Sequence, residues 1–266
     1  AEAVIAGLVD AGMEVIDIGV VPTPVFYFSV GQFEADGGLM ITASHNPMQW
    51  NGLKFMASTG MFLDAAENKE FWALAEQPAT YVTWDKLGKR IADDSWLTRH
   101  IDQVLALPLM YTDAIRARKF RIVLDCINAA GGMIVPPMLD KLGCTIIPMN
   151  CDVSGVFSHT PEPIPENLIE LAEKVKEEKA DLGIAVDPDV DRLVLITEKG
   201  EPYSEEYTIA SCVQFVLSRL ERDGKAKGSN VVVNLSTTRA VDDIAASFGA
   251  RVTRTAVGEI NVARKM

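Results

Sequence analysis

Three aspartates alternate along one short loop and are the residues best suited to chemistry in this sequence. Asp187, Asp189 and Asp191 lie in the segment DPDVDR, between two strongly apolar stretches. Since alternate residues of an extended segment point to the same side, the loop can present all three carboxylates together. Converging carboxylates repel one another and need a cation, and an all-oxygen ligand set favours Mg²⁺ over Zn²⁺. The spacing therefore predicts a metal site, with a solvated acidic turn as the simpler alternative.

An EF-hand calcium loop is a second interpretation of the same segment, because Glu198 stands at its twelfth position. The sixth position, where that loop needs glycine, is Arg192. The flanking residues 182–186 and 193–197 have the apolar pattern of strands, whereas an EF-hand needs helices. We therefore reject the EF-hand. An arginine beside the carboxylates can instead bind a phosphate held next to the metal.

A second polar cluster, TASHNP at residues 42–47, places Ser44 and His45 side by side after an apolar run. Neighbours on an extended chain point to opposite faces, so this pair is poorly arranged as a nucleophile and its base. The sequence has no G-x-S-x-G motif, which further disfavours a serine hydrolase. Two interpretations remain: a polar turn that closes a strand, or a phosphorylated Ser44 whose phosphate shares Mg²⁺ with the aspartates, which we favour.

A phosphate on Ser44 would leave the site with a surplus of negative charge. The phosphate carries about −1.5 to −2 charges, and the three carboxylates add their own negative charges. Mg²⁺ offsets only part of this total. Arg192, Lys54 and His45 are the nearest cations that could offset the rest, while Asn46-Pro47 would hold the turn.

The two other histidines lie outside these clusters. His100 stands in a charged helical stretch and is expected to be solvated. His159 stands on a proline-rich loop, where it could be a capping residue or lie near the site.

The elements that position these loops alternate between helices and strands. Three segments share a helix end, a glycine and a following apolar strand, with Gly12, Gly143 and Gly249 at the left-handed position that ends a helix. The clearest helix is expected over residues 165–180, with Pro165 in its first turn. This alternation predicts an α/β fold with parallel strands.

Composition narrows the class of partner. The chain has 266 residues, 48% of them hydrophobic, and a formal charge of −12. Such an acidic surface argues against nucleic acid or an anionic membrane as the main partner. The four cysteines show no paired spacing, which favours a reducing cytoplasm, and no signal peptide or spanning segment is evident.

Five motifs together resemble one family, the α-D-phosphohexomutases of the phosphoglucomutase/phosphomannomutase superfamily. They are TASHNPMQWNGLK (42–54), LDCINAAGG (124–132), PEPIPENL (161–168), DPDVDR (187–192) and TAVGEINV (255–262). The similarity runs along nearly the whole chain. Many members have DGDGDR in the metal loop, and the aspartates and arginine of that pattern are kept here.

The resemblance implies successive three-layer α/β/α domains with mixed, mainly parallel sheets. We expect an N-terminally incomplete domain I at residues 1–110, domain II at 111–226 and the beginning of domain III at 227–266. Both ends of the chain are expected to interrupt a domain, with most of domain III and all of a fourth, phosphate-binding domain outside this sequence.

The resemblance also implies a role for each residue of the two loops. Ser44 would be the phosphorylated serine and, with Asp187, Asp189 and Asp191, would bind one Mg²⁺. The remaining roles are contact with the phosphoryl group for His45 and Arg192, proton transfer at the sugar hydroxyl for Lys54, and substrate binding for Asn46 and Arg192.

Members of the family interconvert hexose 1-phosphate and hexose 6-phosphate through a bisphosphorylated sugar, with glucose 1,6-bisphosphate or an equivalent as activator. The expected partner is thus a phosphosugar, without nucleic acid or membrane, for a cytoplasmic monomer or homodimer. We expect little turnover from this chain alone. The alternatives are a phosphoglucosamine mutase, a Mg²⁺-dependent sugar phosphatase and a non-catalytic phosphosugar-binding relic.

Overall fold

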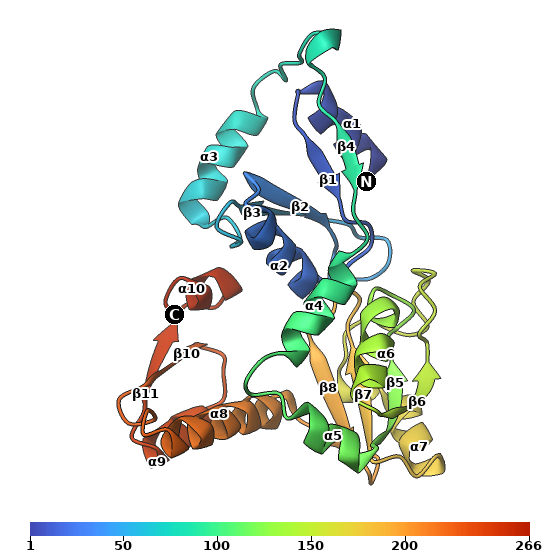
Figure 1. Ribbon diagram of the computed structural model, residues 1–266, viewed down its shortest axis with the longest axis vertical. Coiled ribbons are helices and arrows are strands. Elements are labelled where there is room, and N and C mark those ends of the chain that lie inside the picture. The colour runs from blue at the N-terminus through green and yellow to red at the C-terminus, as the bar shows by residue number, and fades with distance from the viewer.

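The computed structural model describes residues 1–266, which form three units joined in chain order (Figure 1). The N-terminal unit lies at the top of the view, the largest sheet at the lower right, and the C-terminal unit at the lower left. No helix combines the length and the apolar character that crossing a membrane requires.

The N-terminal unit contains two small sheets. Strand β1 (Val15–Asp17) pairs in parallel with β4 (Arg90–Ala92), and β2 (Gly37–Ile41) pairs antiparallel with β3 (Leu53–Ala57). The serine loop, residues 42–52, connects β2 to β3. The surrounding helical elements are α1 (Glu2–Asp10), α2 (Thr23–Phe33), α3 (Ala65–Ala75) and the 3₁₀ turn η1 (Trp84–Lys86).

The middle unit is built on a five-stranded sheet with the order β6-β5-β7-β8-β9. Its strands are β5 (Arg121–Asp125), β6 (Thr145–Met149), β7 (Leu182–Val186), β8 (Leu193–Thr197) and β9 (Pro202–Tyr203). Strand β5 pairs in parallel with β6 and β7, whereas β8 runs antiparallel to both of its neighbours. The acidic loop, residues 187–192, therefore turns the chain between two antiparallel strands, β7 and β8.

Helices cover the middle sheet and lead to the C-terminal unit. The helical elements here are α4 (Trp96–Leu105), α5 (Thr112–Arg118), α6 (Gly131–Lys141), η2 (Pro165–Asn167) and α7 (Ile169–Glu177). The long helix α8 (Glu205–Arg222) then runs along the bottom of Figure 1 to the C-terminal unit. That unit consists of β10 (Asn230–Asn234), α9 (Ala240–Ser247), β11 (Arg251–Thr255) and α10 (Glu259–Ala263), with β10 and β11 parallel.

One hydrophobic core joins the N-terminal unit to the middle unit. It contains 15 buried residues, among them Val25 of α2, Trp96 of α4 and Leu124 of β5. A separate core of 8 buried residues, including Leu171 and Ile196, packs α7 against the other face of the middle sheet. Because fully burying one such aliphatic side chain contributes about 1.5–3 kcal/mol, the shared core holds the serine and acidic loops in fixed relation.

The α/β class expected from the sequence is confirmed, with four parallel strand pairs and three antiparallel ones. The helix expected from Pro165 differs in detail, because residues 165–167 form a 3₁₀ turn and the α-helix begins at Ile169. The expected domain boundaries, after residues 110 and 226, stay predictions.

Candidate active site

The serine loop and the acidic loop meet where the N-terminal and middle units touch. Ser44 Oγ donates a hydrogen bond to Asp187 Oδ2 at 3.1 Å, across 143 residues of sequence. Lys54 Nζ lies 2.9 Å from Asp189 Oδ2 and 3.7 Å from Asp191 Oδ2. The structure thus brings together the two clusters that the sequence singled out separately.

Asp187 is fully buried directly after β7. Its Oδ1 accepts hydrogen bonds from the backbone N–H groups of Asp191 and Arg192, both at 3.1 Å, which folds the acidic loop back on itself. Burial, followed by the nearby charges of Asp191 and Asp189, raises the pKa of Asp187 to about 7. Burial and the neighbouring carboxylates thus disfavour a bare carboxylate at Asp187, and a cation would stabilise it.

Asp189 is 3% exposed, and its two carboxylate oxygens have opposite surroundings. Oδ2 accepts from Thr23 Oγ1 at 2.9 Å, Thr42 Oγ1 at 3.2 Å and Lys54 Nζ at 2.9 Å. Burial disfavours its ionisation, yet the hydrogen bond and charge of Lys54 and the Thr23 hydroxyl hold the pKa of Asp189 below its ordinary value. Oδ1 is buried and has no partner.

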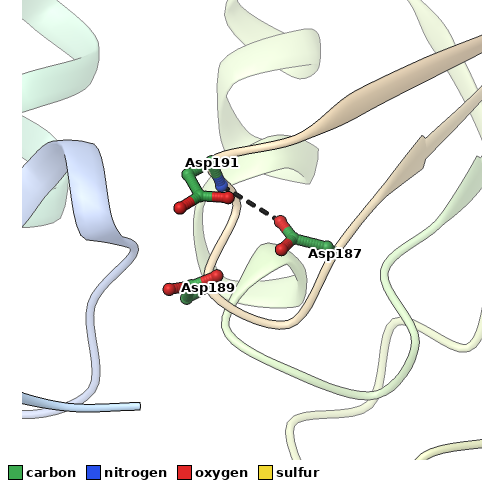
Figure 2. A group of neighbouring side chains, drawn as sticks. All are labelled: Asp187, Asp189 and Asp191. Carbon is green, nitrogen blue, oxygen red and sulfur yellow. Dashed lines mark hydrogen bonds between the residues drawn. The ribbon is translucent and has the colours of Figure 1, made fainter. Parts of the chain in front are cut away.

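The residues of the acidic loop fit a hard divalent cation. One carboxylate oxygen from each of Asp187, Asp189 and Asp191 can be chosen so that all three lie within 4.8 Å of one another. Figure 2 shows the three side chains gathered around one space, with the backbone nitrogen of Asp191 bonded to Asp187. An unpartnered buried carboxylate oxygen is costly, and the one on Asp189 would gain a partner if a cation bound here.

Arg192, His45, Ser44 and Asp187 form a chain of hydrogen bonds in which each residue donates to the next. Arg192 can only donate, so its Nη2, 3.4 Å away, makes His45 Nε2 an acceptor. His45 Nδ1 then carries the proton and faces Ser44 Oγ at 3.3 Å, while Ser44 Oγ donates to Asp187. The expectation that Ser44 and His45 point to opposite faces is wrong, because Ser44 has a left-handed backbone and its Oγ lies at hydrogen-bond distance from His45 Nδ1. Since Nδ1 carries the proton in this arrangement, His45 is not the base that removes the serine proton.

Both loops contain a residue with left-handed backbone. Ser44 has φ +50° and Val190 has φ +60°. For a β-branched residue this conformation is a marked outlier, with a cost of about 1–3 kcal/mol. Val190 occupies a position where many members of the resembled family have glycine, and its side chain packs against the shared core. The backbone is thus held in a shape that valine by itself disfavours.

Arg192 and Asn46 lie at the exposed rim of the site. Arg192 Nη1 is 3.7 Å from Glu162 Oε1, so the guanidinium lies between His45 and a carboxylate of the proline-rich loop. The exposed Asn46 donates from Nδ2 to the carbonyl of Ala43 at 2.7 Å, which closes the serine turn.

One residue of the site, Thr23, carried no recognisable signal in the sequence. Thr23 stands 166 residues from Asp189, at the start of α2, and is fully buried although polar. A buried threonine between Pro22 and Pro24 has no pattern that predicts its partner.

His100 was expected to be solvated, which is wrong: it is half-buried, with its ring 5.5 Å from that of Phe28.

Comparison with protein families finds matches to three domains of one family. The description "Phosphoglucomutase/phosphomannomutase, alpha/beta/alpha domain I" matches residues 1–81, "domain II" matches residues 98–200, and "domain III" matches residues 205–266. The chain belongs to the phosphoglucomutase/phosphomannomutase family. The fold and both loops described above thus lie inside segments that the family shares.

Individual relatives agree with this assignment. A probable phosphoglucosamine mutase of Methanopyrus kandleri is 37% identical over 98% of this chain and 56% of its own length. A phosphoglucomutase/phosphomannomutase of Thermococcus kodakarensis is 36% identical over 100% of this chain and 57% of its own. The crystal structure of a putative phosphomannomutase from Thermus thermophilus superimposes with a TM-score of 0.79 at 27% identity, covering 97% of this chain and 58% of that one. The chain therefore spans about half the length of the relatives it matches.

Proposed function

We propose that this phosphoglucomutase/phosphomannomutase family chain carries the phosphoserine and metal-binding half of a Mg²⁺-dependent phosphohexomutase. The reaction would interconvert hexose 1-phosphate and hexose 6-phosphate through a bisphosphorylated sugar. The observation that supports it most directly is the contact of Ser44 Oγ with Asp187, 3.1 Å away, beside the unpartnered Oδ1 of Asp189.

The residues that would hold the metal are Asp187, Asp189 and Asp191, together with a phosphate oxygen on Ser44. When bound there, Mg²⁺ would supply positive charge to the phosphoryl group. The chain's own residues would do the positioning, which is the main requirement of phosphoryl transfer. Arg192 can fork onto phosphate oxygens, and His45 lies between Arg192 and the serine.

Transfer to the substrate balances with the groups present. A sugar hydroxyl oxygen would form the new bond to phosphorus, and the bond between phosphorus and Ser44 Oγ would break. The proton of the attacking hydroxyl would end on Ser44 Oγ, the leaving oxygen, and Lys54 Nζ, which lies near Asp189 and Asp191, would hold or move that proton. The serine recovers phosphate from the other end of the bisphosphate, so no net phosphate is released. Asn46, at the exposed rim, would contact the substrate.

Phosphoglucosamine is a second candidate substrate class, and the names of the relatives favour it as well. Matches of 36–37% identity include both a probable phosphoglucosamine mutase and a phosphoglucomutase/phosphomannomutase. Assays with glucose, mannose and glucosamine phosphates, on the 266-residue chain and on the complete protein, would separate these substrates.

The test of the phosphoserine is peptide mass spectrometry before and after incubation with glucose 1,6-bisphosphate and Mg²⁺. We expect phosphate on the Ser44 peptide of the wild type and none on Ser44→Ala. Release of inorganic phosphate without isomerisation would instead indicate a sugar phosphatase. A Ser44 that stays bare in the complete protein under these conditions would end the mutase proposal and leave a phosphosugar-binding role.

A further inference from the structure

His159 is a partly buried imidazole that the proposed reaction does not use. Its Nε2 lies 3.2 Å from Asp125 Oδ2, and its Nδ1 lies 2.9 Å from the carbonyl oxygen of Thr160. A carbonyl oxygen only accepts hydrogen bonds, and so does a carboxylate oxygen when Asp125 is ionised. Both ring nitrogens of His159 must therefore donate. The surroundings therefore hold His159 as an imidazolium ion.

Asp125 is built into the middle sheet as a fixed partner. It ends β5, is 3% exposed, and its Oδ1 accepts from the backbone N–H of Ile127 at 2.9 Å. Its Oδ2 accepts from Asn150 Nδ2 at 3.0 Å in addition to His159. Ile127 and Asn150 both have left-handed backbone, with φ of +47°. Because these donors hold the Asp125 carboxylate in place, Asp125 can anchor the His159 side chain that it binds.

The anchored segment reaches the active site three residues later. Pro161 and Pro163 are buried, and Glu162 between them lies 3.7 Å from Arg192 Nη1. Proline restricts the backbone on both sides of the carboxylate, so a displacement at His159 is passed on to Glu162 with little slack. Arg192 in turn faces His45 next to the serine.

We propose that the His159–Asp125 ion pair is a positioning device that fixes the loop over residues 150–164, so that Glu162 holds the Arg192 guanidinium toward the phosphate on Ser44. This inference rests on the function proposed above, because Arg192 matters here as a phosphate ligand. His159, Asp125 and Glu162 act through Arg192 and are positioning residues.

The device depends on pH in a definite direction. The hydrogen bond to Asp125 is the main cause that raises the pKa of His159 above its ordinary value, with burial opposing it. Glu170, on α7, is the other charged side chain that acts on the ring, and it also favours the protonated form. As pH rises through the raised pKa, His159 loses one of its two N–H donors. One of its contacts, to Asp125 or to the carbonyl of Thr160, is then lost, and the hydrogen bond from Asn150 to Asp125 stays as the other attachment of the loop to β5.

The first experiment follows the Nε–H signal of the Arg192 side chain by NMR on the 266-residue chain between pH 6 and pH 9. The signal is identified by its loss in Arg192→Lys. We expect it to move with the titration of the His159 ring in the wild type, and to be displaced and insensitive to that titration in His159→Gln and Glu162→Gln. The matched control is His100→Gln, which changes a half-buried histidine outside the loop.

An Arg192 signal that is the same in His159→Gln as in the wild type would overturn the proposal. Asp125→Asn is the more direct change, but it can disturb folding because it weakens several buried hydrogen bonds at once. His159→Gln removes the positive charge and the ion pair but leaves the hydrogen bonds of Asp125 to Ile127 and Asn150 in place, and is therefore the decisive variant.

The second experiment measures the rate at which glucose 1,6-bisphosphate loads Ser44 in the complete protein. We expect His159→Gln and Glu162→Gln each to slow loading about tenfold, and the double variant to be no slower than either, since both act on one contact. Rates that multiply would mean that the two residues act separately, which contradicts the proposal. If the wild type takes up no phosphate, the proposed function fails, while the Arg192 signal still decides the positioning role.

Discussion

The acidic loop and the serine loop meet at one point but are built in different ways. Asp187 and Asp189 of the acidic loop are buried between two antiparallel strands, with hydrogen bonds to backbone and side chains. The serine loop is more open: Ser44 and His45 are half-buried, and residues 46–51 are exposed. The acidic loop provides fixed hydrogen-bond acceptors, and the serine loop presents donors to it, among them the hydroxyls of Thr42 and Ser44.

In the proposed reaction, this difference would divide the work between the two loops. A bound metal and the charges around it would have to keep their geometry throughout phosphoryl transfer, which suits rigid, buried backbone. The serine would have to be reached by two different ends of a sugar bisphosphate, which suits an accessible edge. Changes in the acidic loop should therefore alter both stability and phosphate loading, whereas changes in the serine loop should alter loading alone.

The largest expected effect comes from Asp189→Asn. This change removes the charge paired with Lys54 and one of the three carboxylates, so we expect at least a ~1,000-fold loss of Ser44 loading and about 2 kcal/mol of lost stability. Mass spectrometry and urea unfolding measure the two effects. Asp113→Asn, at a side chain 98% exposed, is the control. Loading within threefold of the wild type would remove Asp189 from the metal site.

A metal titration across pH sharpens the same contrast. The pKa of Asp187 is raised, so its contribution to stability is present below the ordinary value near 3.8 and is lost as pH rises through about 7. The metal-free chain should thus lose stability over this interval. Mg²⁺ at 100 times its dissociation constant at pH 8 should restore about 2.7 kcal/mol at that pH. The same concentration should raise Tm less at pH 6, where a proton on Asp187 competes with the metal. Equal shifts at both pH values would contradict a site that contains Asp187.

Thr23→Val tests the link from the N-terminal unit to the acidic loop. The substitution keeps the shape of the side chain but removes the hydroxyl that donates to Asp189, so we expect a loss of about 1–2 kcal/mol in the free energy of unfolding. Thr98→Val, at an exposed position of α4, is the matched control and should change stability by less than about 0.5 kcal/mol.

The smallest effect on stability is expected for Ser44→Ala. The hydroxyl is half-buried and makes long hydrogen bonds, so its loss should change the free energy of unfolding by less than about 1 kcal/mol while abolishing phosphate uptake. A large loss of stability in this variant would mean that the serine loop, too, is a structural anchor, and the contrast between the loops would fail.

The sequence predicted the parts of this site that depend on local patterns. Alternating aspartates between two apolar strands indicated the acidic loop, and the structure has that loop between β7 and β8. Contacts between distant segments could not be predicted from local patterns. Thr23 reaches Asp189 only through tertiary folding, and Glu162 contacts Arg192 from a loop with no periodic pattern. The same limit explains the error at His100, because the charged residues around it gave no sign of the aromatic ring of Phe28 that covers it.

The three donors to Asp189 Oδ2 all come from the N-terminal unit, although Asp189 belongs to the middle sheet. The same two units share a core of 15 buried residues. They therefore form one cooperative block, in which neither unit can open without exposing the other. The C-terminal unit has its own two-stranded sheet and meets the N-terminal unit through side chains such as Tyr27, which donates to Glu259 at 3.0 Å. Amide hydrogens of β10 and β11 should exchange through local openings, at a lower free energy than those of β5 and β7.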